Sequence, residues 1–276
     1  MRSKGMVGKF SVRENPSPRR PTSRVKCDEN RWVDNCSRLT NACPIREQFF
    51  FFGLSTFSWN VNGVRSRIVE IRDFIDKHSP DIFLLQETHL RPEHSFKIPN
   101  YVCCRNNRTY PAPGRGGTVI LIKNSISHYH VPTPPLLRGV EVTLITITPI
   151  DHEPILIGSI YIPSNNSYFR NLGATLDAIF NINNKTVLVG DFNAKHTSLG
   201  CHCSDTRGNR LYSYTVNNSI DVFAPPTPTR FGVASASIID YALIKNLNWP
   251  CTINSIPELS SELNPIKLHF PRTSKF

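Results

Sequence analysis

Residues 187–196 read VLVGDFNAKH, an apolar run that ends in a cluster of polar side chains. The same arrangement occurs at residues 81–89, DIFLLQETH, where a short continuous apolar run is typical of a buried strand. Three further motifs follow or interrupt apolar runs: WNVNG at 59–63, IYIPS at 160–164 and SIIDY at 237–241. Because loops at strand ends often carry function, the five motifs together predict one site at the edge of a sheet.

The pattern around these motifs predicts an α/β fold. Helical periodicity indicates helices at residues 65–78, 168–180 and 209–217. Apolar runs indicate strands at residues 54–59, 81–86, 101–105, 118–123, 140–148, 155–162, 186–189, 238–244 and 266–270. Many strands with a few interspersed helices predict two mixed β-sheets packed face to face with helices outside.

Length and composition are compatible with one large domain. The 276 residues are 39% hydrophobic, enough for a full core. We expect a basic, disordered N-terminal extension at 1–48, a folded domain at 49–272 and a short tail at 273–276. The most apolar stretch near the start, residues 49–57, is about half of a membrane span and follows a polar segment. We therefore expect an intracellular protein with neither a signal peptide nor a membrane segment.

The charge is basic but unevenly spread. Residues 1–47 contain 11 Lys and Arg against 5 Asp and Glu, so they contribute +6 of the net +11 and leave +5 for the rest. A basic excess favours a polyanionic partner such as nucleic acid, although this excess alone decides little. The first segment could be a nuclear-import or nucleic-acid-binding arm instead of a plain disordered extension.

The eight cysteines form no regular disulfide framework, and we expect reduced thiols. Cys36 with Cys43, or Cys201 with His202 and Cys203, could be considered as zinc ligands. Neither group has the paired spacing of a structural zinc site, so this alternative is disfavoured.

The polar motifs fit metal-assisted cleavage of a phosphodiester. Mg²⁺ prefers oxygen ligands, and Glu87 follows a buried strand, with Asn60 or Asp191 as neighbours. Asp191 could orient a water, while Asn193, Asn60 and Tyr161 could donate to phosphate oxygens. Each residue also has a purely structural explanation: an Asx turn for Asp191, a cap for Glu87, a satisfied core hydroxyl for Tyr161, a paired acid for Asp240. Five polar motifs occurring in this order by coincidence are much less expected than any one of them, which favours the catalytic interpretation.

The ordered motifs resemble the endonuclease/exonuclease/phosphatase superfamily. More narrowly, they resemble the endonuclease of jockey-like non-LTR retrotransposons. The narrower resemblance is carried by GRGGTVILIK at 114–123, GDFNAKHTSLG at 190–200, TPTRF at 227–231 and ELSS at 258–261. It extends from about Leu54 to Phe270.

The resemblance implies a four-layer, DNase I-like α/β sandwich that nicks double-stranded DNA and leaves a 3′-hydroxyl end. It implies Mg²⁺ or Mn²⁺ as cofactor, with Glu87 as ligand and Asn60 beside it. The implied catalytic positions are Asp191, Asn193, Tyr161, Asp240, Glu262 and Leu263. The implied DNA-binding positions are Thr229, Arg230, Arg115, Lys195 and His196.

The last motif departs from the family's pattern. The family closes with Ser-Asp-His, then one residue and Pro, whereas this chain has Ser261, Glu262 and Leu263 before Asn264 and Pro265. Leu263 cannot donate, accept or carry charge, so we expect severely impaired cleavage. By the resemblance, Asp240 would orient the missing imidazole. Without that cation its buried carboxyl should have a raised pKa.

Other functions remain open at this point. A catalytically inactive, DNA-binding remnant of such an element is the main alternative, and Leu263 is the discriminating feature. An abasic-site endonuclease or a lipid phosphodiesterase of the same superfamily has less support from the 114–117 and 227–231 loops. The last expected strand lies near Phe276, so we expect no reverse transcriptase on this chain. A nuclear location is expected for a functional copy. The oligomeric state and the target site stay open.

Overall fold

The computed structural model describes residues 53–108, 114–135, 137, 139–149, 152–164, 171–232 and 235–271. The expectations for residues 1–48 and 273–276, which include Cys36 and Cys43, lie outside these ranges. Within them, none of the helices combines the length and the apolar character that crossing a bilayer requires.

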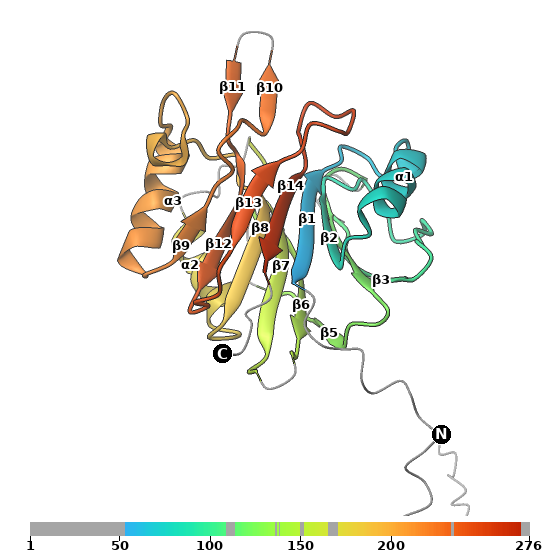
Figure 1. Cartoon of the computed structure of the whole chain (residues 1–276). Coiled ribbons are helices and arrows are strands. Elements are labelled where there is room, and N and C mark those ends of the chain that lie inside the picture. The colour runs from blue at the N-terminus through green and yellow to red at the C-terminus, as the bar shows by residue number, and fades with distance from the viewer. Residues whose placement is uncertain are drawn as a thin grey trace, which may run out of the picture. The chain divides into compact units, whose positions relative to one another are not determined.

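The strands form two six-stranded mixed sheets and one separate hairpin (Figure 1). The first sheet has the order β13 (Thr252–Ser255), β14 (Ile266–Phe270), β1 (Leu54–Asn60), β2 (Ile82–Gln86), β4 (Thr118–Lys123) and β3 (Tyr101–Asn106). The second has the order β5 (His128–Val131), β6 (Glu141–Ile147), β7 (Ile155–Tyr161), β8 (Thr186–Asp191), β12 (Asp240–Lys245) and β9 (Asp221–Phe223). The hairpin pairs β10 (Arg230–Gly232) with β11 (Ser235–Ser237).

Three apolar clusters separate four layers. One lies between the sheets and contains Leu84 of β2 and Val187 of β8. A second packs α1 (Ile68–His78) on the outer face of the first sheet. The third packs α2 (Leu172–Phe180) and α3 (Thr206–Asn217) on the second sheet. The predicted four-layer, DNase I-like α/β sandwich is confirmed.

The two-residue period of the strands directs the polar motifs into the space between the sheets. In β1, Phe57 and Trp59 pack toward α1, so Asn60 faces the second sheet. In β8, Val187 and Val189 belong to the cluster between the sheets, so Asp191 faces the same space. Because β1 and β2 are parallel, as are β7 and β8, the carboxyl ends of each pair lie at one edge.

The predicted strands are confirmed, with shifted ends. The expected strand at 238–244 begins at Asp240. The expected helix at 209–217 begins at Thr206, because the Asp205 carboxylate accepts from the Gly208 amide and caps the helix. The helix expected at 168–180 is described from Leu172. Strands β5, β9, β10, β11 and β13 were not expected, because they are short, largely exposed and lack a clear apolar period.

Candidate active site

A carboxylate–amide cluster joins the two sheets at their common edge. The Nδ2 of Asn60 donates to Oε1 of Glu87 at 2.7 Å and to Oδ2 of Asp191 at 2.9 Å. Asn193 donates its backbone amide to Oδ1 of Asp191 at 2.9 Å and its Nδ2 to Oδ2 at 3.0 Å. The Tyr161 hydroxyl bonds Glu87 as well, so five residues from four separate sequence motifs meet in one cluster. We call Asn60, Glu87, Tyr161, Asp191 and Asn193 the carboxylate cluster.

Glu87 is held in its charged form. Burial by itself raises the pKa of Glu87, but hydrogen bonds from His89, Asn60 and Tyr161 outweigh it and hold the pKa below its usual value. Burial, together with the charge of Glu87, raises the pKa of Tyr161, so its hydroxyl stays a donor. The Glu87 side chain is 25% exposed, which leaves room for solvent on one side.

A glycine-rich turn fixes the strained backbone that carries Glu87. Glu87 and His89 have φ of 49° and 56°, a region that side chains disfavour. The Thr88 and His89 amides donate to the carbonyls of Gly117 and Gly116 at 3.2 and 2.8 Å. A Cβ on Gly117, itself at φ 85°, would lie 2.9 Å from Oγ1 of Thr88, so only glycine fits this approach.

Asp191 and Asp240 form a buried acidic pair, because they are directly opposite each other on β8 and β12. Burial raises the pKa of Asp191 to about 7, although Asn60 and the Asn193 amide oppose the shift. Burial and then the charge of Asp191 raise the pKa of Asp240 well above its usual value. The Oδ2 of Asp240 is buried without a hydrogen-bond partner in the described part of the chain. The raised pKa of Asp240 is the shift expected from the sequence, with burial and the charge of Asp191 as its causes.

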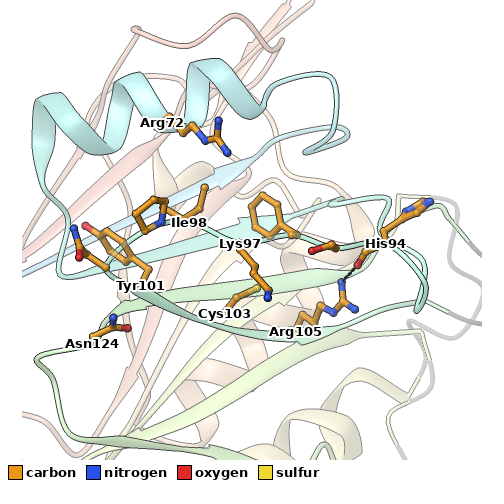
Figure 2. A pocket seen from close by; sticks show the side chains of 12 residues that line it. Arg72, His94, Lys97, Ile98, Tyr101, Cys103, Arg105 and Asn124 are labelled. Carbon is orange, nitrogen blue, oxygen red and sulfur yellow. Dashed lines mark hydrogen bonds between the residues drawn. The ribbon is translucent and has the colours of Figure 1, made fainter.

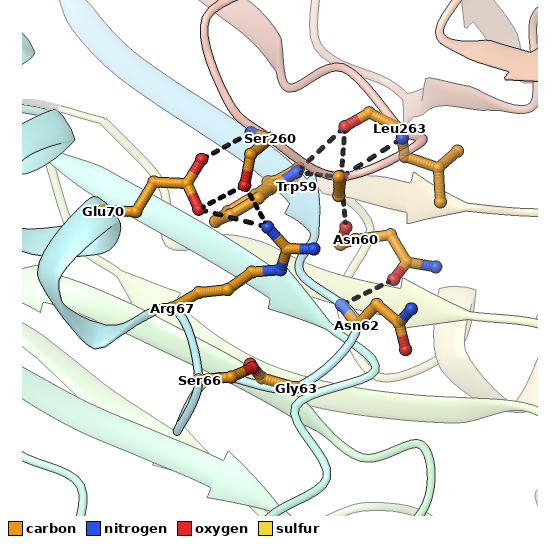
Figure 3. A network of polar contacts seen from close by, with 10 residues as sticks. Trp59, Asn60, Asn62, Gly63, Ser66, Arg67, Glu70, Ser260 and Leu263 are labelled. Atoms are coloured by element: carbon orange, nitrogen blue, oxygen red, sulfur yellow. Dashed lines mark hydrogen bonds and ion pairs between the residues drawn. The ribbon is translucent and has the colours of Figure 1, made fainter.

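The loop that carries Leu263 is positioned by its backbone and by Ser261 (Figure 3). Oγ of Ser261 accepts from Nε1 of Trp59 at 2.8 Å and donates to the carbonyl of Leu263 at 2.6 Å. The Trp59 Nε1 also donates to the Leu263 carbonyl at 3.0 Å. On the other side, Leu263 forms a β-bridge with Arg230, and the Asn264 amide donates to the Thr229 carbonyl at 2.7 Å. The Leu263 side chain takes part in none of these bonds.

A second set of contacts ties the same loop to the start of α1 (Figure 3). Nη1 of Arg67 pairs with Oε2 of Glu70 at 3.2 Å and contacts Oγ of Ser260. Ser260 also donates to Glu70 at 3.0 Å. The loop is thus anchored at both ends, independently of the Leu263 side chain.

The predicted DNA-binding residues fall into two groups. Arg115 and Arg230 are exposed, and Lys195 is half-buried. His196 has a structural role, because its Nδ1 accepts from the Ser198 amide and its ring stacks on Tyr212 at 4.1 Å.

The expectation that Thr229 faces DNA is corrected by the structure. Its side chain is 0% exposed, and Oγ1 accepts from the amides of Ile239 and Asp240 at 3.2 and 3.3 Å. Its hydroxyl also bonds the Asp240 carboxylate. A threonine between Pro228 and Arg230 is typical of a surface loop, but the backbone turns its side chain inward, where it positions Asp240.

Three residues near the cluster were not assigned from the sequence. His89 lies 3.6 Å from Oε2 of Glu87. Glu141 is directly opposite Tyr161 on β6 and pairs with Arg108. Burial raises the pKa of Glu141, which the Gly117 amide and Arg108 oppose. An acid at the very start of an apolar strand was the only available signal for Glu141.

The donor set suits a hard cation better than zinc. Among the described residues, no three His, Cys, Asp or Glu side chains gather as a metal-binding group, and the Cys201 thiol instead donates to the Ile238 carbonyl at 3.2 Å. Glu87 supplies an oxygen beside solvent, as Mg²⁺ requires if waters complete its shell. Asn60 turns its nitrogen to the acids, while its Oδ1 accepts from the Asn62 amide at 3.2 Å. Asn60 therefore positions the two acids through its nitrogen, while its oxygen is directed to the backbone of Asn62.

Asp240→Asn should reduce the pH dependence of stability between about pH 5 and 7. The folded pKa of Asp240 is raised, so the folded state keeps a proton that the unfolded state releases above about pH 3.9. Stability therefore falls as pH rises through this window, by up to about 1.4 kcal/mol per pH unit for one proton. Urea unfolding at both pH values measures the loss. An equal loss in both proteins would contradict the raised pKa.

Comparison with known proteins agrees with the geometry. The chain is 30% identical over 212 residues to a probable RNA-directed DNA polymerase from transposon X-element of Drosophila melanogaster, and 25% identical over 213 residues to the RNA-directed DNA polymerase from mobile element jockey of Drosophila funebris. Each match covers 75% of this chain but 23% of the relative, so the chain spans about a quarter of their length.

Solved structures show the same fold. The endonuclease domain of TRAS1, a telomere-specific non-LTR retrotransposon, matches with a TM-score of 0.64 and 15% identity over 80% of this chain and 99% of that one. The AP endonuclease LMAP from Leishmania major matches with a TM-score of 0.65 and 14% identity over 80% and 88%. The model of the Endonuclease/Exonuclease/phosphatase family matches residues 57–253. The chain belongs to this family, and its curated relatives are retrotransposon proteins.

Proposed function

We propose that the chain is a metal-dependent endonuclease that hydrolyses one phosphodiester of double-stranded DNA, and that its turnover is impaired at Leu263. The observation that carries the proposal is the carboxylate cluster, in which Asn60 holds a charged Glu87 and a buried Asp191 together at the sheet edge. The family and the retrotransposon relatives support a nuclease acting on DNA. The proposed setting is the nucleus, where such an enzyme meets its target.

Each cluster residue has a proposed task. Glu87 would hold Mg²⁺ or Mn²⁺, which would supply positive charge to the phosphate under attack. Asp191 accepts a proton from the attacking water, and its pKa of about 7 suits a base at neutral pH. Asn193 and the Tyr161 hydroxyl bind phosphate oxygens. Arg230 and Arg115, both exposed, contact the DNA backbone.

Glu87→Gln should weaken Mn²⁺ binding by at least about 10-fold, because an amide keeps the shape of Glu87 but removes its charge. Titration with Mn²⁺ followed by water proton relaxation measures the affinity without DNA. The matched control is Glu93→Gln, which removes an acid whose side chain is 64% exposed. Equal affinities for the natural chain and Glu87→Gln would refute the assignment of Glu87.

Leu263 also supports a second candidate function, a DNA-binding protein that no longer cuts. In that case the basic surface would hold duplex DNA while the carboxylate cluster stays idle. This candidate predicts salt-sensitive duplex binding together with no nicking, and no recovery of nicking when Leu263 is replaced by histidine. The repair experiment in the Discussion separates the two.

A further inference from the structure

A basic cleft lies outside the carboxylate cluster, on the outer side of the first sheet (Figure 2). Its volume is about 740 Å³. Arg72 enters from α1 on one side, and Lys97 and Arg105 enter from the loop after β2 and from β3 on the other. The full lining is Arg72, His94, Ser95, Phe96, Lys97, Ile98, Pro99, Asn100, Tyr101, Cys103, Arg105 and Asn124. We call this feature the α1–β3 cleft.

The α1–β3 cleft is positively charged without compensation from its own walls. It contains two arginines and a lysine, and none of its twelve lining residues is Asp or Glu. Burial raises the pKa of the Cys103 thiol to about 11. Burial, and then the charges of Asp81 and Asp76 behind the wall, raise the pKa of the Tyr101 hydroxyl to about 12, so both groups stay neutral. The cleft therefore favours an anion.

The contact between His94, which lines the cleft, and Arg65 also lacks a hydrogen-bond acceptor. Nδ1 of His94 accepts from the Arg91 amide at 3.1 Å, so a neutral imidazole carries its proton on Nε2. That Nε2 lies 3.3 Å from Nη1 of Arg65, which is always a donor. Two donors thus face each other, and an anionic oxygen beside them would accept from both.

The wall of the cleft is preformed. Nη1 and Nη2 of Arg105 donate to the carbonyls of His94 and Pro92 at 2.7 and 3.0 Å, which fixes the loop across the opening. The Tyr101 hydroxyl donates to the Pro80 carbonyl at 2.6 Å. A ligand therefore meets a wall that is already ordered, which lowers the entropic cost of binding.

We propose that the α1–β3 cleft binds the phosphodiester backbone of single-stranded nucleic acid, separately from the strand that is cut. The cleft's volume of about 740 Å³ lies in the range of pockets that hold small molecules, so it can take a few nucleotides but not a whole duplex. A flexible single strand can enter such a hollow and place successive phosphates near Arg72, Lys97 and Arg105.

The test compares two double variants of the full chain that each remove two positive charges. Arg72→Gln with Lys97→Gln removes cations from the cleft. Arg210→Gln with Lys185→Gln is the control, because Arg210 lies on α3, on the opposite side of the sandwich from α1, and Lys185 pairs with the exposed Glu153 (Figure 1). Binding of labelled single-stranded DNA and of single-stranded RNA is followed by fluorescence anisotropy in EDTA over a series of salt concentrations.

The cleft variant should bind one or both single strands more weakly, with a slope of log K against log salt shallower by about 1.4, which is two contacts at about 0.7 each. The control should keep the natural slope. When the cleft substitutions are introduced into the Leu263→His, Glu262→Asp chain, duplex nicking, which uses the carboxylate cluster, should not change. An equal loss in both variants would overturn the proposal. So would competition by inorganic phosphate as strong as that by the oligonucleotide, since this would indicate a site for a free oxyanion.

Photo-crosslinking gives a second, local readout that does not depend on the variants. A single strand with a photoreactive base should crosslink to peptides that contain Lys97 or Tyr101. Crosslinks confined to peptides of the carboxylate cluster would refute the cleft as the binding place. Because the binding is measured in EDTA, loss of the proposed nuclease function would leave this result unaffected.

Discussion

Nicking of supercoiled plasmid in Mg²⁺ by the double variant Leu263→His with Glu262→Asp is expected to exceed nicking by the natural chain by about 10²–10⁴-fold. The reason is that an imidazole at position 263 can supply the proton or the positive charge that leucine cannot. Asp240 is its proposed partner, because Asp240 is buried and its Oδ2 has no hydrogen-bond partner in the described part of the chain.

The loop should accept this change without rearrangement. Ser261, the Leu263 backbone and the Arg230 bridge fix the course of the chain, and the Leu263 side chain makes none of those bonds. Leu263 is only partly buried, so a ring of similar size can be placed there without opening a cavity. Glu262 is exposed, so its shortening to Asp should cost little stability.

Two controls make the repair experiment decisive. Glu262→Asp alone should nick no faster than the natural chain, because the imidazole is still absent. Leu263→Asn adds a polar side chain that cannot become a cation and should recover much less activity than histidine. If the folded double variant nicks no faster than the natural chain, Leu263 does not stand in place of a catalytic histidine. That result would support the second candidate function, a DNA-binding protein that does not cut.

Most of the fold could be predicted from the sequence because its strands are long and buried. DIFLLQ at 81–86 and TVILIK at 118–123 are nearly continuous apolar runs, and both are strands in the structure. The short edge strands could not be predicted in the same way. SAS at 235–237 and TINS at 252–255 carry no apolar period, and their pairing depends on neighbours that are distant in sequence.

The site was predictable in its members but not in their orientation. Motif order predicted that Asn60, Glu87 and Asp191 meet, and the structure joins them by hydrogen bonds. The sequence could not show that Asn60 presents its nitrogen to the acids or that Thr229 turns inward, because both depend on a side-chain rotation or a backbone turn. Glu141 was missed because its role comes from its register opposite Tyr161.

Asp191→Asn, introduced into the repaired Leu263→His, Glu262→Asp chain, should reduce nicking by about 10²–10⁴-fold. Asp191 is proposed to take the proton of the attacking water, and an amide of the same shape cannot do so. The repaired chain is the required background, since loss of activity from an already impaired protein would be too small to measure. Plasmid nicking under single-turnover conditions measures the chemical step.

The loss must be separated from unfolding, because Asp191 is 1% exposed and accepts from Asn60 and from both the amide and side chain of Asn193. An asparagine at position 191 would direct its side-chain NH₂ toward these donors, and the lost hydrogen bond costs about 1–3 kcal/mol of stability. Urea unfolding of the variant therefore accompanies the rate measurement. Asp221→Asn, at the exposed far end of the β12 pairing, is the matched control and should retain the repaired rate. Asp191 lies opposite Asp240 and is hydrogen-bonded to Asn60, so a purely structural role is the alternative. If a stable, folded variant still nicks at the repaired rate, the buried acidic pair stabilises the fold and another group activates the water.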